Sequence, residues 1–385
     1  MQMKTKQKSD KATLILLSMY FILKPFYLWE SGLPQVSDLV LTAAIILYIF
    51  SNGLKLNFLK GSKQFVLVNV IFVFYITFIN ILWSLLLGGE KCFFTASMFY
   101  VFNFMTLSFI ISLYSIHGRQ IYRLVYFSVL ASIALQFVIL LLSGGFAGNR
   151  AMAYFNNPNQ LGYHSLLTLA LLLFLGGKLN IKGIWLITGI IVASALCLAS
   201  LSKAAIISFF GMLLYFVLLH IKDLIFARNT NKTIFILLFI VAALLTAYKC
   251  NNEAFNSNIL FQSVGYRLST IGQSNDDNLS QRGYDRLFAY QQYLLFGAGE
   301  GIYSRFGSTA EFHSTLGNIL MSYGIVGISL YMAILSAVCI KNRREGLYII
   351  GFVTLYGLTH NSIRNTLFWI MTALIYSNGK KGNDI

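Results

Sequence analysis

Long uncharged, mostly apolar runs alternate with short charged connections along this chain of 385 residues. Runs such as 65–87, 92–116, 124–149 and 183–202 contain no Asp, Glu, Lys or Arg. A helix rises about 1.5 Å per residue, so about 20 apolar residues cross the roughly 30 Å hydrocarbon core of a bilayer. The pattern therefore predicts an all-α fold, a polytopic membrane bundle.

We expect about twelve transmembrane helices in one integral membrane domain that covers residues 1–385, because no internal repeat or linker divides the chain. The last two expected spans are the shortest. The expected bounds are Ala12–Trp29, Val36–Ser51, Phe65–Leu87, Phe93–Tyr114, Leu124–Leu142, Leu161–Leu175, Gly183–Ala199, Ala204–Leu219, Thr233–Tyr248, His313–Cys339, Gly346–Thr359 and Thr366–Tyr376.

Composition excludes a water-soluble globular fold. Hydrophobic residues make up 57% of the chain and charged residues 11%, whereas about a quarter of an ordinary globular domain is charged. Most of the surface must therefore meet lipid.

The net charge of +16 is distributed unevenly over the connections between the expected spans. Alternate connections carry 19 of the 29 Lys and Arg residues and only four acidic residues. Because cytoplasmic loops are enriched in Lys and Arg, this bias places both termini in the cytoplasm. It also argues against a nucleic-acid partner, since the cations are scattered over seven short connections rather than gathered on a folded surface.

The longest connection, residues 249–312, falls on the opposite, periplasmic side. It is too long for a passive turn in a compact bundle, and long connections often carry function. We expect short helices within it, including one over Gln281–Phe296 that places Arg282 and Arg286 on one face. Glycines from Gly297 onward are expected to end that helix.

Several cations on this outer side lie beside helix ends and are not required by the topology rule. A cluster of such groups suits a lipid-linked pyrophosphate, because Arg binds phosphate through a planar, bidentate fork. The alternatives are solvated loops and side chains that reach lipid phosphates. The candidates are Arg150, Lys203, Arg282, Arg286 and Arg364.

Two shorter features also stand at expected helix starts. Asn157 and Pro158 are typical of a helix N-cap and first turn. His313 opens the tenth span, where a lone His is most often an interfacial residue with a satisfied hydrogen bond. Gly324 and Gly327, further along that span, are by themselves ordinary packing positions for membrane helices.

Three segments together resemble the bacterial O-antigen ligase and O-antigen polymerase superfamily. The first is Arg150 followed by Tyr154-Phe155-Asn156-Asn157-Pro158-Asn159. The second is Ser200-Leu201-Ser202-Lys203-Ala204, in which Lys stands where the family has Arg. The third is His313-Ser314, nine residues, Gly324, two residues and Gly327, preceded by a loop that carries Arg282.

The resemblance implies a metal-independent glycosyltransferase without a cofactor, working at the periplasmic face of the bacterial inner membrane. It would transfer glycan from an undecaprenyl-pyrophosphate-linked donor to a sugar hydroxyl of a lipid-linked acceptor. His313 would act as general base, since imidazole has an unperturbed pKa of about 6.5, and Arg282 would assist catalysis. Arg150, Lys203, Arg286 and Arg364 would bind pyrophosphate, and the further candidates are Glu311, Glu300, His360 and Asn159.

The residues leave the exact reaction open. The His-Ser string is closer to ligases, which join finished glycan to the lipid A core, whereas the Asn-Asn-Pro-Asn segment and compact loop favour a polymerase. We expect a polymerase, for which the resemblance adds a chain-length regulator protein and membrane lipid as partners. A secondary transporter is the alternative of another class, although the chain lacks the repeated halves typical of transporters.

Overall fold

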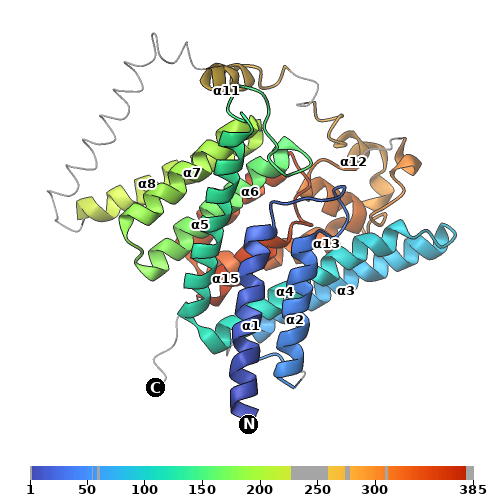
Figure 1. Cartoon of the computed structure of the whole chain (residues 1–385). Coiled ribbons are helices and arrows are strands. Elements are labelled where there is room, and N and C mark those ends of the chain that lie inside the picture. The colour runs from blue at the N-terminus through green and yellow to red at the C-terminus, as the bar shows by residue number, and fades with distance from the viewer. Residues whose placement is uncertain are drawn as a thin grey trace.

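The computed structural model describes residues 2–53, 55–58, 61–226, 259–273, 278–307 and 311–378. Every regular element in these ranges is a helix, as predicted (Figure 1). The α-helices are α1 (Gln2–Leu23), α2 (Val36–Ser51), α3 (Lys63–Leu86), α4 (Cys92–His117), α5 (Arg119–Leu142), α6 (Pro158–Leu179), α7 (Gly183–Ser200), α8 (Lys203–Phe226), α11 (Ile259–Ser269), α12 (Asp285–Ala289), α13 (Thr315–Lys341), α14 (Arg343–Gly357) and α15 (Thr366–Ser377).

Seven helices in the described ranges are long and apolar enough to cross a membrane, namely α3 to α8 and α13. The protein is therefore membrane-embedded. Helices α2 and α15 are apolar but shorter, and α1 and α14 cover most of two further expected spans. The expected span Thr233–Tyr248 lies outside the described residues, so the count of twelve stays a prediction.

Helix α15 explains why one expected span is short. Its 12 residues extend about 18 Å, which is less than the hydrocarbon core of a bilayer. All of them are buried against neighbouring helices, including α4, α6 and α13. A helix that is apolar all round is stable when it is enclosed by protein, and α15 lies in the core of the bundle rather than against lipid.

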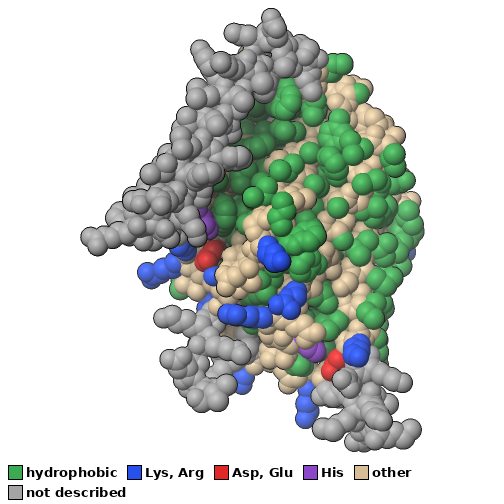
Figure 2. Space-filling model, turned by 60° about the vertical axis from the view of Figure 1, so that its left-hand side comes forward, with side chains coloured by type: hydrophobic (Ala, Val, Ile, Leu, Met, Phe, Trp, Pro, Cys, Tyr) green, Lys and Arg blue, Asp and Glu red, His purple; other side chains and the backbone are tan. Residues whose placement is uncertain are grey.

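Successive connections lie at opposite ends of the bundle. At the end with the N-terminus, the hydroxyl of Tyr376 donates to the carbonyl of Gly61 (3.1 Å). At the other end, where Figure 1 shows α11 and α12, the amide of Tyr27 donates to the carbonyl of Tyr154 (3.0 Å). Figure 2 shows Lys and Arg side chains gathered below an apolar surface, toward the N-terminal end. Which end faces the cytoplasm stays a prediction.

The expected helix over Gln281–Phe296 is wrong in extent. The structure has the five-residue helix α12 followed by a 3-10 turn, Gln291–Tyr293. Gly283, at a φ of +87°, interrupts the chain between Arg282 and α12. Left-handed backbone cannot continue an α-helix, so Arg282 and Arg286 do not share one helical face.

Helix α13 is broken at Gly324, which is therefore more than an ordinary packing position. Its φ of 65° and ψ of −168° lie outside the helical region. The break frees the carbonyls of Met321 and Ser322, which accept hydrogen bonds from the amides of Ala298 (3.0 Å) and Gly299 (2.8 Å). Irregular backbone inside a membrane protein needs such internal partners, and here the long loop provides them.

Candidate functional site

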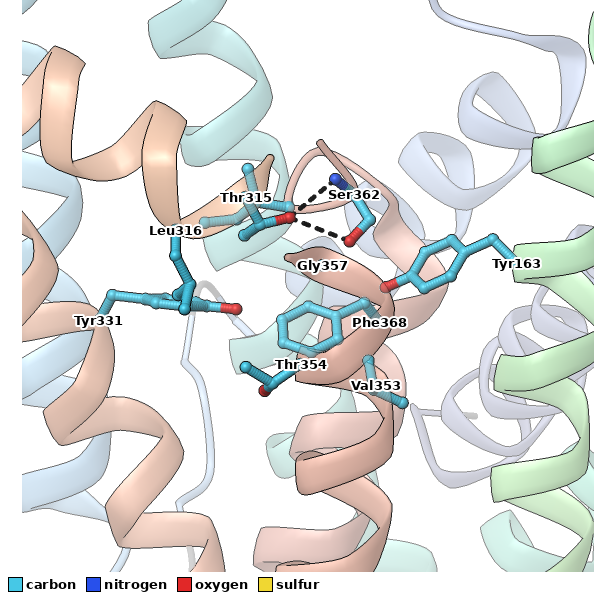
Figure 3. Close-up of a pocket in the computed structure, with 10 residues that line it drawn as sticks. Tyr163, Thr315, Leu316, Tyr331, Val353, Thr354, Gly357, Ser362 and Phe368 are labelled. Carbon is cyan, nitrogen blue, oxygen red and sulfur yellow. Dashed lines mark hydrogen bonds between the residues drawn. The ribbon is translucent and has the colours of Figure 1, made fainter. Parts of the chain in front are cut away.

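Three connections that are distant in sequence meet at the end of the bundle opposite the N-terminus. They are residues 143–157 before α6, residues 270–273, 278–307 and 311–314 before α13, and residues 358–365 between α14 and α15. Figure 3 shows one point of attachment, where Thr315 of α13 bonds Ser362 of the last connection. The polar side chains of these three connections therefore lie at the same end of the bundle.

Four cationic or titratable residues from these connections form what we call the arginine–histidine cluster: Arg150, Arg282, His313 and His360. The amide of His313 donates to the carbonyl of Arg282 (3.1 Å). The Arg282 guanidinium in turn donates to the carbonyl of Thr359, next to His360. Arg150, Arg282 and His313 all act electrostatically on His360, so the structure brings these four groups together.

Helix α6 positions Arg150 through its first turn. The Asn157 side chain caps α6 by accepting from the amides of Asn159 (2.7 Å) and Gln160 (3.3 Å), with Pro158 at the first helical position, which confirms the predicted cap. The Arg150 guanidinium donates to the side-chain oxygen of Asn159 (2.9 Å). Asn159 is thus a support for Arg150.

Tyr356, which the sequence did not single out, joins α6 to this cluster. Its hydroxyl donates to the carbonyl of Asn159 (3.0 Å). Its ring lies between those of Tyr163 and His360, stacked at centroid distances of 4.5 and 4.6 Å. A Tyr near a helix end gives no sequence signal for such a role, because the two stacking partners come from different helix ends.

His360 stays neutral near physiological pH. Burial, together with the electrostatic effects of Arg282, His313 and Arg150, lowers the pKa of His360 to about 3. Both causes disfavour the imidazolium form. The Nδ1 atom lies 2.9 Å from the hydroxyl of Thr359, so the ring is held in place as a hydrogen-bonding group without adding positive charge.

A second group of side chains surrounds Glu300, which is 1% exposed. We call it the Glu300 network. One carboxylate oxygen accepts from the hydroxyls of Tyr100 (2.9 Å) and Tyr323 (2.8 Å). The other accepts from Asn318 (2.8 Å) and from the guanidinium of Arg364 (2.6 Å). The four partners come from α4, α13 and the connection before α15.

Electrostatics keep both members of the buried ion pair charged. Burial alone would raise the pKa of the Glu300 carboxyl, but Arg364 and the surrounding donors outweigh it and hold that pKa below its usual value. Arg364 also bonds the exposed carboxylate of Glu311 (3.0 Å). Arg364, a candidate pyrophosphate ligand, thus forms ion pairs with two carboxylates in this structure.

The two remaining cationic candidates, Lys203 and Arg286, contact other parts of the long loop. The Lys203 amine donates to the carbonyl of Thr270 (2.8 Å), just after α11. The buried Arg286 guanidinium lies 6.0 Å from the centroid of the Phe312 ring. Lys203 therefore holds the loop to α8, and Arg286 packs against the segment that precedes His313.

Enclosed space beside Thr315 is too small for a substrate. The pocket in Figure 3 has a volume of 10 Å³, room for about one water molecule. In the part of the chain that the structure describes, no three His, Cys, Asp or Glu side chains gather as metal ligands. The expectation of metal-independent chemistry stays a prediction.

Searches of protein-family models and of curated proteins found no match to this chain.

Proposed function

We propose that this protein is a membrane glycosyltransferase that uses a polyprenyl-pyrophosphate-linked glycan, and that it polymerises O-antigen or a similar surface polysaccharide. The carrying observation is the arginine–histidine cluster, in which three separate connections bring Arg150, Arg282 with His313, and His360 to one end of a membrane-embedded bundle. The resemblance of the sequence to O-antigen polymerases and ligases supports the same class and the undecaprenyl carrier.

In this mechanism, the acceptor hydroxyl attacks the anomeric carbon of the donor sugar, and the bond from that carbon to the pyrophosphate oxygen breaks. The imidazole of His313 takes the hydroxyl proton. The pyrophosphate leaves with its full charge, which the fixed guanidinium groups of Arg150 and Arg282 stabilise. A neutral His360 orients Thr359, whose carbonyl holds Arg282.

Glu300 and Arg364 position the site in this proposal rather than touch substrate, because each is engaged by the other inside the Glu300 network. Glu311 is about half exposed and remains the alternative base. We assign the reaction to the periplasmic face of the inner membrane, where an activated sugar must arrive already attached to its carrier.

The test is His313→Ala in cells whose own copy is deleted, with His220→Ala as matched control because His220 lies on α8, outside the site. We expect His313→Ala to lose long-chain glycan while the protein accumulates normally in the membrane. Full-length glycan in that variant would remove His313 as the base. On deletion, single-repeat glycan indicates a polymerase, and accumulated lipid-linked polymer indicates a ligase.

A secondary transporter is favoured by one observation, the broken helix α13, since discontinuous helices line the sites of many transporters. Purified protein in proteoliposomes distinguishes the two classes. A glycosyltransferase extends an added lipid-linked oligosaccharide, whereas a transporter exchanges a labelled soluble solute across the bilayer without forming a glycosidic bond.

A further inference from the structure

An open groove of 380 Å³ lies between α11 and the connection from α5 to α6. This volume falls within the ~300–1,000 Å³ typical of small-molecule sites. Six of its eight lining residues carry side chains that form hydrogen bonds: Asn149, Arg150, Gln262, Ser263, Tyr266 and Arg267. The groove is thus large enough for a ligand and is lined for a polar one.

Contacts on both sides hold α11 over this groove. Lys203 at the start of α8 bonds the carbonyl of Thr270 (2.8 Å), and the Arg267 guanidinium bonds the carbonyl of Leu201 (3.4 Å). Gly148 lies so close to α11 that a Cβ there would be 2.3 Å from the Ile259 side chain. The two walls therefore have a defined spacing.

The lining also defines the charge of a suitable ligand. Arg150 and Arg267 face the groove, and none of the eight lining residues is Asp or Glu. Guanidinium groups pair with carboxylates and phosphates through charge-assisted hydrogen bonds. A polyprenyl chain would cover the guanidinium, amide and hydroxyl groups of the lining without offering them hydrogen bonds in place of those to water.

We propose that this groove binds an acidic sugar unit, such as a hexuronic acid, of the glycan that the enzyme extends. This inference rests on the proposed function and adds the class of substrate. Arg150 belongs both to the groove and to the arginine–histidine cluster. A glycan bound in the groove would therefore contact Arg150, one of the groups assigned to the reacting centre.

Binding of a hexuronic-acid-containing tetrasaccharide tests the proposal. Calorimetry uses the full chain in nanodiscs of neutral lipid and compares the acid with its carboxyl-reduced form. We expect the carboxyl-reduced saccharide to bind about tenfold or more weakly than the acid. We expect the same loss of affinity for the acid in Arg267→Gln. Asn149→Asp places a carboxylate in the groove at almost constant shape, and it should weaken binding of the acid but not of the reduced form. Arg119→Gln, at the other end of the bundle, is the control.

Equal binding of the two saccharides, or unchanged binding of the acid in both groove variants, overturns the proposal. The same measurement in nanodiscs that contain anionic phospholipid tests whether a lipid headgroup occupies the groove instead. If the anionic lipid abolishes saccharide binding in an Arg267-dependent way, the groove is a lipid headgroup site and the proposal is wrong.

A turnover assay on the same preparations separates this inference from the proposed function. If the saccharide binds in a charge-dependent way but no glycosyl transfer occurs, the proposed function is wrong and the groove proposal stands. If transfer occurs but binding does not depend on the carboxylate, only the groove proposal is wrong.

Discussion

The Glu300 network offers the sharpest test of how the loop is held. Glu300→Gln preserves the shape of the side chain but removes the negative charge beside Arg364. The carboxylate accepts four side-chain hydrogen bonds at 2.6 to 2.9 Å. An amide has one oxygen, so the two tyrosine hydroxyls or the Arg364–Asn318 pair must lose their acceptor.

Breaking a buried ion pair at one partner costs about 3–5 kcal/mol, because the other charge stays buried without compensation. Arg364 keeps its bond to Glu311, so we expect the low end, about 3 kcal/mol of unfolding free energy. Glu345→Gln is the matched control. Its bond to Lys178 is 2.8 Å long, but both side chains are more than a quarter exposed, and such pairs contribute about 0–1 kcal/mol.

The assay is unfolding by denaturant in mixed micelles, followed by tryptophan fluorescence. Trp83 reports on the loop, because its indole donates to the carbonyl of Gly297 (3.0 Å). Equal losses of unfolding free energy in Glu300→Gln and Glu345→Gln would refute the reasoning that burial makes the Glu300–Arg364 pair contribute more than the Glu345–Lys178 pair.

The pH dependence gives an independent check of the same pair. The pKa of Glu300 in the folded protein is below its usual value, so the unfolded chain binds the proton first. The stabilisation is therefore complete above the unfolded carboxyl pKa of about 4.3 and is lost as pH falls through the lowered folded pKa. Glu300→Gln should remove this acid-induced loss, and a wild-type profile in that variant would contradict it.

Three further predictions concern single residues. Arg282→Lys should reduce glycan synthesis nearly as much as Arg282→Ala, because an ammonium lacks the planar fork; wild-type activity would indicate that a point charge suffices. Gly297→Ala should reduce the yield of folded protein on size-exclusion chromatography, because its Cβ would lie 2.3 Å from the carbonyl oxygen of Ser322. In the control, Gly307→Ala, the new Cβ meets no atom within 4 Å, so its yield should fall only through backbone strain. His360→Gln should remove a loss of stability between about pH 6.5 and 3, since the unfolded imidazole binds a proton before the folded one, whose pKa is about 3; an unchanged pH profile of unfolding would contradict this.

Local sequence patterns predicted those parts of the fold that depend on neighbouring residues. Uncharged runs predicted the long apolar helices, because a helix in lipid satisfies its own backbone and needs only apolar side chains. The Asn157 cap was predictable for the same reason, since its hydrogen bonds reach only two and three residues along the chain.

The loop was less predictable, because its conformation depends on distant partners. Apolar periodicity over 281–296 favoured a continuous helix, yet this segment turns at Gly283 and binds the broken part of α13. Asn80 of α3 joins α4 and α13 through its bonds to Ser97 and Tyr323. Its third bond, to the amide of Glu300, depends on where the loop enters the bundle.

By itself, the sequence determined a helical membrane protein with arginines and histidines at the ends of its helices. Only the tertiary structure decided which of them meet. It placed Arg150, Arg282, His313 and His360 together, and it paired Arg364 with Glu300. Hydropathy and capping act over a few residues, whereas these contacts join segments up to about two hundred residues apart and exist only once the helices have packed.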